Sequence, residues 1–514
     1  MRDTYDVVIV GSGPAGAAYA RTIKEARPTA RILMVEAGPA VSDPPGRHVR
    51  TITDPRERVA AQFASQGPEA RPDDYEEQVA RALSPSRGRS AGLVARPGTW
   101  LLDTSAPAEG ETGFPAAALS SNVGGMGAHW SGASPWPDAA ELSKDLDPDR
   151  FHAALADARR LLQVTQSAFE QAPLGADVRR LLGAHYNPGR EVDRVVQPMP
   201  LAMEVRPDGQ RYWTGPGIML GDLLTGHGDG FELRSDTAAR RILTTAGRAD
   251  GVLLHDRLED REYEVGARFV VVAADALRSP QLLSASGIRP AALGHYLNEH
   301  TMTTNTIQLD DSLRAAAQGL RKTSEGAVDV LAGVSWVPFH DPSFPFHGQV
   351  TQWDASPIPV DDTFEAWPGS VVECSVFMGK AEVRYEDHLK FDDSHPDYLG
   401  MPSIKVHYTF TEADRQRLDA AVAEAKRMGS LLGEPINGLE PAVMPHGASL
   451  HYQGTTRLGS DDTTSVVDTS LRIWGNDTLY VGGNGTIPTP AACNPTLTTV
   501  ALCVLGARDL AGRL

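Results

Sequence analysis

The sequence predicts a mixed α/β protein with two domains, one of which is interrupted along the chain. Residues 5–35 have the pattern of a buried strand, a glycine-rich turn, an alanine-rich helix and a second buried strand. Residues 301–440 differ, because their aromatic and β-branched runs predict a second sheet. Residues 441–514 return to the first pattern. A chain of 514 residues is long enough for two domains, since single cores stop growing at roughly 250–300 residues.

The composition disfavours several classes of protein. The formal charge of −18 repels phosphate backbones and anionic lipids, so we expect neither nucleic acid nor a membrane as a partner. The three cysteines form no CxxC pair and no His/Cys cluster at metal-ligand spacing, which favours a reducing compartment and no bound metal. No secretory leader precedes the first strand, and no apolar run approaches the roughly 18 residues of a spanning helix. The sequence therefore predicts a cytoplasmic protein.

The first strand, Tyr5–Val10, ends at a glycine-rich turn with the sequence GSGPAG. Gly11 permits the tight turn, and Gly13 lets the backbone approach a pyrophosphate. Gly16 allows close packing of the following helix, Ala15–Ala26. The turn alone is a weak signal, but its place between a strand and a helix is the one that a dinucleotide site requires.

Glu36 follows the second strand, Ile32–Val35, where an acidic side chain can accept hydrogen bonds from a ribose diol. An ordinary solvated loop acid is the alternative. These residues alone do not separate FAD from NAD. Residues 39–98 are rich in Pro, Arg, Asp and Ser, with one possible helix over residues 74–83. We expect a long arm that covers the cofactor or meets another subunit, or else a mobile loop.

The remaining strands are predicted from short apolar runs bounded by turn residues. Residues 233–274 form a meander with a turn at Gly247–Gly251, which returns to the first sheet. In the second domain, a polar stretch over residues 310–325 precedes three strands. These strands are Val330–Val337, Gln349–Trp353 and Ile404–Phe410.

Three further segments carry candidate functional residues. The segment Gly124–Trp130 (GGMGAHW) is a turn in which the backbone can pass close to a planar ring, or a structural turn with a core histidine. Near the C-terminus, a strand at Leu479–Val481 precedes a helix that is predicted to begin with Asn494 as its N-cap and a proline next to it. His451, taken by itself, fits a structural or a catalytic role.

In combination, these motifs resemble those of the glucose-methanol-choline (GMC) oxidoreductase family. The resemblance rests on GSGPAG with Glu36, on GGMGAHWSGASP and on LYVGGNGTIPTPAACNPTL, in this order. It is strongest to the pyranose oxidase branch, which includes shorter bacterial enzymes that oxidise C-3 of sugars and of C-glycosides. The runs VVDTSLRIWG, VVVAADALRSPQLL and HGQVTQWD also have counterparts in that branch, so most of the chain is covered.

The resemblance implies a discontinuous Rossmann-like FAD-binding domain and a sheet-rich substrate-binding domain. The first comprises residues 1–140, 195–300 and 441–514, with residues 39–98 as the long arm or loop. The second comprises residues 141–194 and 301–440. The implied activity is the oxidation of a secondary hydroxyl, at C-2 or C-3, of a pyranose sugar or glycoside. Oxygen or a quinone-type acceptor then reoxidises the flavin.

The resemblance also assigns the site residues. His451 is the base that takes the hydroxyl proton, and Asn494 holds the same oxygen. The cofactor side comprises Gly11, Gly13, Gly16, Glu36, Gly125, Met126, His129, Ala238, Asn484 and Thr496. On the substrate side, Gln349 matches a sugar-contacting position, with a solvent-facing strand glutamine as the alternative. Ser131 matches a residue near flavin N5, with a backbone-bonding serine as the alternative.

The chain departs from the fungal members of the family at several positions. The histidine that matches His129 is bonded covalently to the flavin there, but Gly127 and Ala128 replace hydroxyl-bearing residues before it, which favours non-covalent FAD. Asp275 stands where the family usually has glycine. The chain is shorter, so tetramer formation is not carried over and the oligomeric state stays open.

The sequence leaves three alternative functions open. They are a sugar dehydrogenase that uses an acceptor other than oxygen, a lyase on the same scaffold with structural FAD, and an NAD-dependent dehydrogenase. The last one would not need GGMGAHW or CNPTL at their positions.

Overall fold

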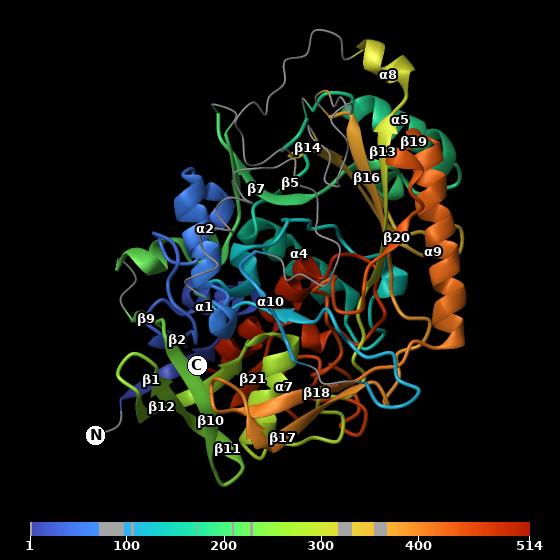
Figure 1. The fold of residues 1–514 in the computed structure, drawn as a ribbon. Helices are drawn as coiled ribbons and strands as arrows, with labels where there is room; N and C mark the ends of the chain where they lie inside the picture. Colours follow the sequence, from blue (N-terminus) through green and yellow to red (C-terminus); the bar gives the residue numbers. More distant parts are fainter. Residues whose placement is uncertain are drawn as a thin grey trace.

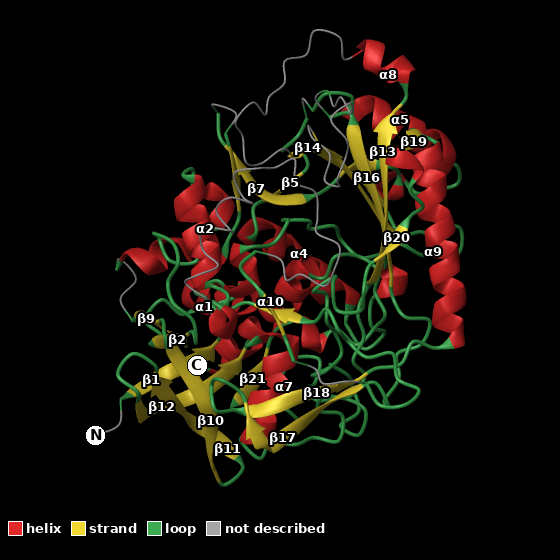
Figure 2. Cartoon of the chain, in the orientation of Figure 1, coloured by secondary structure: helices red, strands yellow, loops and turns green. Residues whose placement is uncertain are grey.

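The computed structural model of the chain describes residues 3–70, 97–103, 107–170, 172–207, 210–226, 230–316, 331–353, 367 and 369–514. The possible helix at residues 74–83 lies outside these ranges. Figures 1 and 2 show one sheet at the lower left, a second sheet at the upper right, and helices between and beside them. The prediction of a mixed α/β protein with two sheets is confirmed.

The first sheet combines a parallel part with an antiparallel hairpin. Its parallel strands lie in the order β21-β12-β1-β2-β9, and β10 and β11 continue from the first half of β12 in antiparallel pairing. The central strands are buried on both faces, as their β-branched runs predict. The strands are β1 (Thr4–Val10), β2 (Ile32–Val35), β9 (Phe231–Arg234), β10 (Thr237–Thr245), β11 (Arg248–Asp256), β12 (Arg261–Val272) and β21 (Leu479–Val481).

Helices α1 (Pro14–Ala26), α10 (Thr496–Arg513) and α4 (Pro148–Leu161) pack in series beside this sheet, α1 on α10 and α10 on α4. Pro14 begins α1 at the position where the missing N–H costs least. Apolar side chains of all three helices join the core of the sheet. Helix α7 (Asp275–Ala285) follows β12 and packs on β10.

The second sheet is antiparallel and has the order β19-β13-β16-β15-β14-β6. One of its faces packs on α9 (Glu412–Ser430) and α5 (Gly175–Tyr186), with α9 on the right in Figure 1. Thr411 and Asp414 form a capping box that begins α9. The strands are β6 (Gln197–Pro198), β13 (Thr301–Leu309), β14 (Leu331–Val337), β15 (His347–Trp353), β16 (Val371–Met378) and β19 (Gly433–Pro435), and β20 (Ala442–Val443) also pairs with β13.

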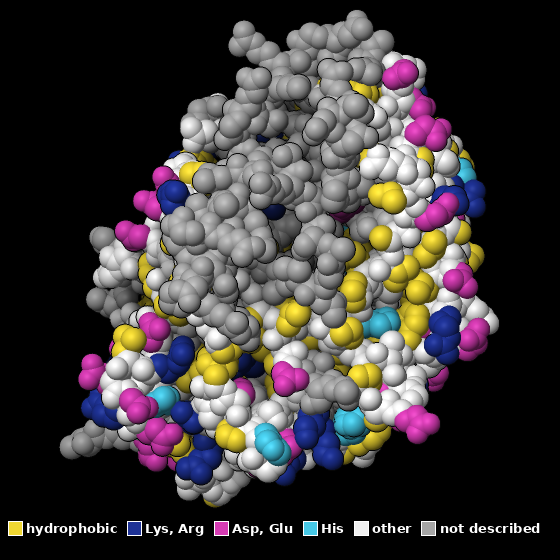
Figure 3. All heavy atoms as spheres, viewed as in Figure 1, with side chains coloured by type: hydrophobic (Ala, Val, Ile, Leu, Met, Phe, Trp, Pro, Cys, Tyr) yellow, Lys and Arg dark blue, Asp and Glu magenta, His cyan; other side chains and the backbone are white. Residues whose placement is uncertain are grey.

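Smaller elements complete the described fold. β17 (His388–Pro396) pairs with β18 (Pro402–His407), β3 (Trp100–Leu101) with β4 (Ala118–Leu119), and β7 (Leu201–Val205) with both β5 (Val164–Thr165) and β8 (Arg211–Trp213). The short helices are α2 (Pro55–Ala64), α6 (Pro216–Leu220) and α8 (Asp311–Ala316). Within the described part of the chain, no helix is both long and apolar enough to cross a bilayer. Acidic and basic side chains are interspersed over the lower part of the face in Figure 3.

Two details of the sequence prediction need correction. The predicted N-cap of the last helix is wrong, because Pro495 is the N-cap of α10 and Asn494 lies before it. The predicted turn at Gly247–Gly251 is too long, since β11 begins at Arg248 and includes Gly251. In both places the observed end of the helix or strand differs from the end predicted from residue propensity.

Candidate functional site

One cavity lies where β1, β2 and β12 end, and it brings together most of the residues predicted from the sequence. This edge of a parallel sheet is where α/β proteins bind dinucleotides. The predicted residues that line it are Gly11, Gly13, Glu36, Gly125, Met126, His129, Ser131, Ala238, His451, Asn484, Asn494 and Thr496. Gly16 and Gln349 lie outside the lining.

The three glycines of the first turn have different surroundings. A Cβ at Gly11, whose φ is +102°, would lie 2.3 Å from the Ala273 carbonyl oxygen, and a Cβ at Gly16 would lie 2.0 Å from that of Gly11. These two glycines are therefore required by the packing of the protein itself. A Cβ at Gly13 would meet no protein atom closer than the Gly124 carbonyl oxygen at 3.9 Å, so its backbone faces open space in the cavity. A cofactor can approach the chain closely at Gly13.

Glu36 links the two glycine-rich turns. Its Oε2 atom accepts hydrogen bonds from the Ser12 backbone N–H at 3.2 Å and from the Ser12 hydroxyl at 2.8 Å. The Ser12 hydroxyl oxygen in turn accepts from the Gly124 N–H at 2.9 Å. Burial raises the pKa of Glu36, against the effect of these donors. Glu36 thus fixes the turns and still lines the cavity, and the sequence did not indicate the role of Ser12.

His129 is held through one ring nitrogen. Its Nε2 atom lies 3.1 Å from the Ser65 hydroxyl and 3.3 Å from Oδ1 of Asn122. The Ser65 hydroxyl donates to the Ala61 carbonyl, so both neighbours act as acceptors and the proton lies on Nε2. Burial lowers the pKa of His129 to about 4, so the ring is neutral at pH 7. A Cβ at Gly98 would lie 2.5 Å from Nδ1, which leaves little room on that side.

His451 and Asn494 reach the same cavity from separate segments. His451 follows Leu450, which has a φ of +61°, and its ring packs 5.8 Å from that of Phe377 on β16. Its Nδ1 atom lies 3.0 Å from Nδ1 of His300. One of these nitrogens donates and the other accepts, so His300 determines which nitrogen of His451 carries the proton.

Two buried carboxylates hold the loops that carry this pair. Glu299 accepts from the Gly447 N–H at 2.9 and 2.8 Å and from the Ser449 hydroxyl at 3.2 Å, just before His451. Glu141 accepts from the backbone N–H groups of residues 492 and 493, just before Asn494, at 2.7 and 3.1 Å. Burial raises the pKa of Glu141. Buried acceptors of this kind fix a backbone, because losing them leaves amide groups unpaired.

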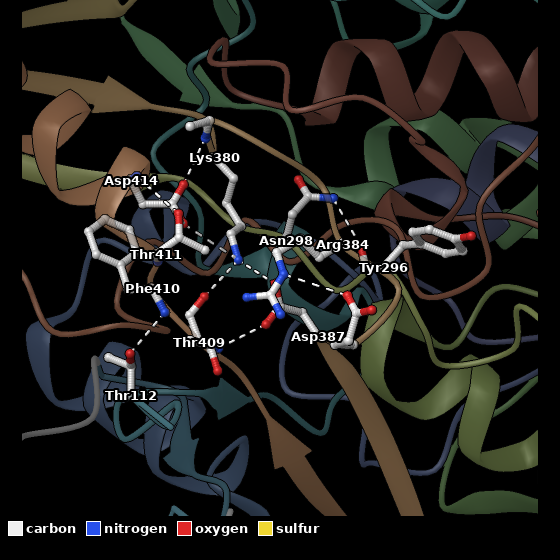
Figure 4. A network of polar contacts seen from close by, with 12 residues as sticks. Thr112, Tyr296, Asn298, Lys380, Arg384, Asp387, Thr409, Phe410, Thr411 and Asp414 are labelled. Atoms are coloured by element: carbon white, nitrogen blue, oxygen red, sulfur yellow. Dashed lines mark hydrogen bonds and ion pairs between the residues drawn. The ribbon is translucent and has the colours of Figure 1, made fainter. Parts of the chain in front are cut away.

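A buried ion-pair network surrounds Lys380 (Figure 4). Lys380 is 0% exposed, pairs with Asp387, lies 3.8 Å from Asp414, and donates to the Thr409 carbonyl at 2.9 Å. The Asp387 backbone carbonyl accepts from the Leu297 N–H at 2.8 Å. The network therefore ties the end of β16 and the start of α9 to the segment that leads into His300.

Two histidines near the cavity escaped the sequence reasoning, His300 and His347. Burial lowers the pKa of His300 to about 4 and that of His347 to about 3. The sequence held weak signals for both histidines. His300 ends the polar trio Asn298–His300, and His347 precedes Gln349 by two positions, so both lie on the same face of a strand. Gln349 itself donates to the Thr351 hydroxyl at 3.3 Å and does not line the cavity.

Asp275 now has a physical explanation. Its φ is +68°, the left-handed region that glycine adopts most easily and that aspartate tolerates better than most residues. Its carboxylate accepts from the N–H groups of Leu277 at 2.6 Å and Arg278 at 3.0 Å, which caps the start of α7. The cap offsets the backbone strain of a side chain at this position.

Comparisons with known proteins agree on one family. Two models described as GMC oxidoreductase match residues 204–302 and 389–503. A C-glycoside 3-oxidase of Microbacterium trichothecenolyticum is 47% identical over 512 residues, which cover 99% of this chain and 97% of the relative. A pyranose 2-oxidase of Tricholoma matsutake is 30% identical, and the match covers 99% of this chain and 94% of the relative. The solved structure of Aspergillus oryzae formate oxidase has the same fold, with a TM-score of 0.69 at 14% identity, over 100% of this chain and 99% of that chain.

Proposed function

Because the chain belongs to the GMC oxidoreductase family and is therefore an oxidoreductase, we propose that it uses FAD to oxidise the C-3 hydroxyl of a sugar glycoside to a ketone. One observation carries the proposal: a relative named C-glycoside 3-oxidase matches almost the whole chain at 47% identity. The cavity supports it, because it presents an imidazole and a carboxamide. The first sheet is the FAD-binding domain, and the second sheet bounds the substrate.

The residues present fit FAD. The open backbone at Gly13 suits a pyrophosphate, and Glu36 lies where a ribose diol would be bound. His451 and Asn494 also line the cavity, so an imidazole and a carboxamide are available to a group bound there.

FAD is held without a covalent bond. The Nε2 atom of His129 carries the proton that Ser65 and Asn122 accept, so it has no lone pair to form a bond. The opposite nitrogen faces the backbone of Gly98. After acid precipitation of the holoprotein, the flavin should therefore remain in the supernatant. A yellow pellet would contradict non-covalent binding.

The reaction needs a base and a group that holds the reacting oxygen. His451 takes the hydroxyl proton, and the electron pair left on the oxygen forms the C=O bond of the ketone. The hydrogen leaves the carbon with the electron pair of the C–H bond, as hydride. Asn494 holds the oxygen and orients the C–H bond. When bound, FAD supplies the hydride acceptor and is later reoxidised by oxygen or another acceptor, such as a quinone. Ser131, which also lines the cavity, influences reoxidation.

A panel of C-glycosides, O-glycosides and free sugars tests this proposal. Each compound is mixed anaerobically with the holoprotein, and the oxidised flavin band and the carbon NMR of the product are recorded. Bleaching of the band with a carbonyl at C-3 supports the proposal. A carbonyl at C-2 would reassign the position, and a consumed sugar without bleaching would favour the lyase alternative.

A further inference from the structure

His347 and Trp336 form a buried pair beside the cavity that the proposed reaction does not use. The Nε1–H of Trp336 donates to Nδ1 of His347 at 3.0 Å. Trp336 is 1% exposed and His347 is 0% exposed, so water does not compete for this hydrogen bond. The two residues lie on the neighbouring strands β14 and β15, where Trp336 is opposite Gln349 and His347 is two positions away on the same strand as Gln349.

The hydrogen bond fixes the position of the proton on His347. An indole N–H only donates, so Nδ1 of His347 must accept and carries no proton. Burial lowers the pKa of His347 to about 3, which keeps the ring neutral at pH 7. A neutral imidazole with an unprotonated Nδ1 carries its single proton on Nε2. His347 therefore presents an N–H group on the side away from Trp336.

Asn494 is the side chain available to that N–H group. Nε2 of His347 and Oδ1 of Asn494 are both buried, and neither has a hydrogen-bond partner among the described residues. The Asn494 carboxamide also affects the pKa of the His347 ring. Of the two ends of a carboxamide, only the oxygen can accept from an N–H. The arrangement therefore selects one of the two orientations of the Asn494 amide.

We propose that Trp336 and His347 are positioning residues that hold the oxygen of Asn494 toward His347 and turn its NH₂ group toward the reacting oxygen. The proposal rests on the proposed function, because it specifies how Asn494 serves in that reaction. As the hydroxyl loses its proton, negative charge develops on its oxygen. An N–H donor already aimed at that oxygen stabilises the transition state, whereas the inverted amide would present its own oxygen and repel the charge.

Replacing Trp336 by phenylalanine removes the donor and keeps an aromatic ring in the core. Without it, either nitrogen of His347 can carry the proton, so the amide loses its fixed orientation. We expect the flavin-reduction rate at saturating sugar to fall by about 10- to 100-fold, less than the roughly 10²- to 10³-fold loss expected when a transition-state donor is removed outright. FAD content should not change, and the apparent sugar affinity should change by less than about threefold.

Trp213→Phe is the matched control. Trp213 lies in the same buried cluster as Trp336, and its Nε1–H has no partner among the described residues. This variant removes the same atom from the same core without touching His347, and its reduction rate should stay close to that of the wild type. Equal losses in the two variants would show a structural effect and overturn the proposal.

A second comparison separates positioning from packing. In an Asn494→Ala background, Trp336→Phe should cause no further loss of rate, because the group it orients is gone. A full additional loss would overturn the proposal.

A test that does not need turnover is ¹⁵N NMR of the wild-type holoprotein labelled with ¹⁵N-histidine, which shows which ring nitrogen of His347 carries the proton. The His347→Gln variant assigns the signal. The proposal predicts a protonated Nε2 and an unprotonated Nδ1. A protonated Nδ1 would contradict it, even if the sugar panel succeeds. If no sugar bleaches the flavin, the proposed function fails while this tautomer can still be read.

Discussion

The two ends of the cavity are built by opposite means. At one end, which we call the glycine end, Gly11, Gly13, Gly16 and Glu36 come from a single βαβ unit, and the absence of side chains makes the space. At the other, the histidine end, His451 and Asn494 come from separate segments and depend on buried partners such as Glu141, Glu299 and Lys380. Adding a side-chain atom should therefore lower stability or FAD affinity at the glycine end. At the histidine end, removing a buried partner should lower stability.

The largest effect is expected from Lys380→Met at the histidine end. The substitution leaves Asp387 and Asp414 buried without their cation, and breaking a buried pair costs about 3–5 kcal/mol. Denaturant unfolding of the variant and the wild type measures this loss of stability. Lys426→Met is the control, because Lys426 and its partner Glu440 are 61% and 76% exposed and the pair should contribute less than about 1 kcal/mol. Equal effects would show that the buried network does not stabilise this end.

Two alanine substitutions test the glycine end. Gly16→Ala places a Cβ 2.0 Å from the Gly11 carbonyl oxygen, so the unfolding free energy of the FAD-free protein should fall by about 1–3 kcal/mol. In Gly13→Ala the nearest protein atom to the added Cβ is the Gly124 carbonyl oxygen at 3.9 Å, so the FAD-free protein should keep its stability while FAD affinity falls. Thermal unfolding without FAD and titration with FAD separate the two outcomes. Unchanged FAD affinity in Gly13→Ala would show that the pyrophosphate does not bind next to Gly13.

Acid should destabilise the protein through two buried histidines, His129 and His300. Burial lowers the pKa values of His129 and His300 to about 4, whereas the unfolded chain binds these protons near pH 6.5. The unfolded state therefore holds more protons between these values, and stability is lost as the pH falls from about 6.5 toward 4. The slope is at most about 1.4 kcal/mol per pH unit for each histidine.

The variants His129→Gln and His300→Gln assign this slope to single residues. Each should make the pH dependence of the unfolding free energy shallower by up to one proton, as measured by denaturant titration at several pH values. A slope that does not change in either variant would mean that these rings are not buried in the neutral form.

The smallest effect is expected at Asp275. Glycine at this position relieves the strain of a φ of +68° but loses the cap of α7, so Asp275→Gly should change the unfolding free energy by less than about 1 kcal/mol. Asp275→Ala loses the cap without relieving the strain and should cost more. The reverse order of the two variants would contradict the capping role.

The same contrast explains what the sequence could predict. The glycine end is local in the chain, and its strand, turn and helix carry residue-specific backbone requirements, so GSGPAG and Glu36 were readable. His451 and Asn494 were found through the family resemblance. Their partners His300, His347 and Glu141 were missed, because the local sequence does not specify contacts between residues that are far apart in the chain. The N-cap prediction for Asn494 was wrong by one residue, because α10 begins with Pro495 as its N-cap.

Pre-steady-state reduction of the flavin in His451→Ala tests the central claim most directly. The variant and the wild type, both loaded with FAD, are mixed anaerobically with a C-glycoside that the wild type oxidises. The account predicts that reduction slows by about 10²- to 10⁴-fold, the usual contribution of a general base, while FAD stays bound. Reduction at the wild-type rate would contradict it, because the proton would then leave without the imidazole.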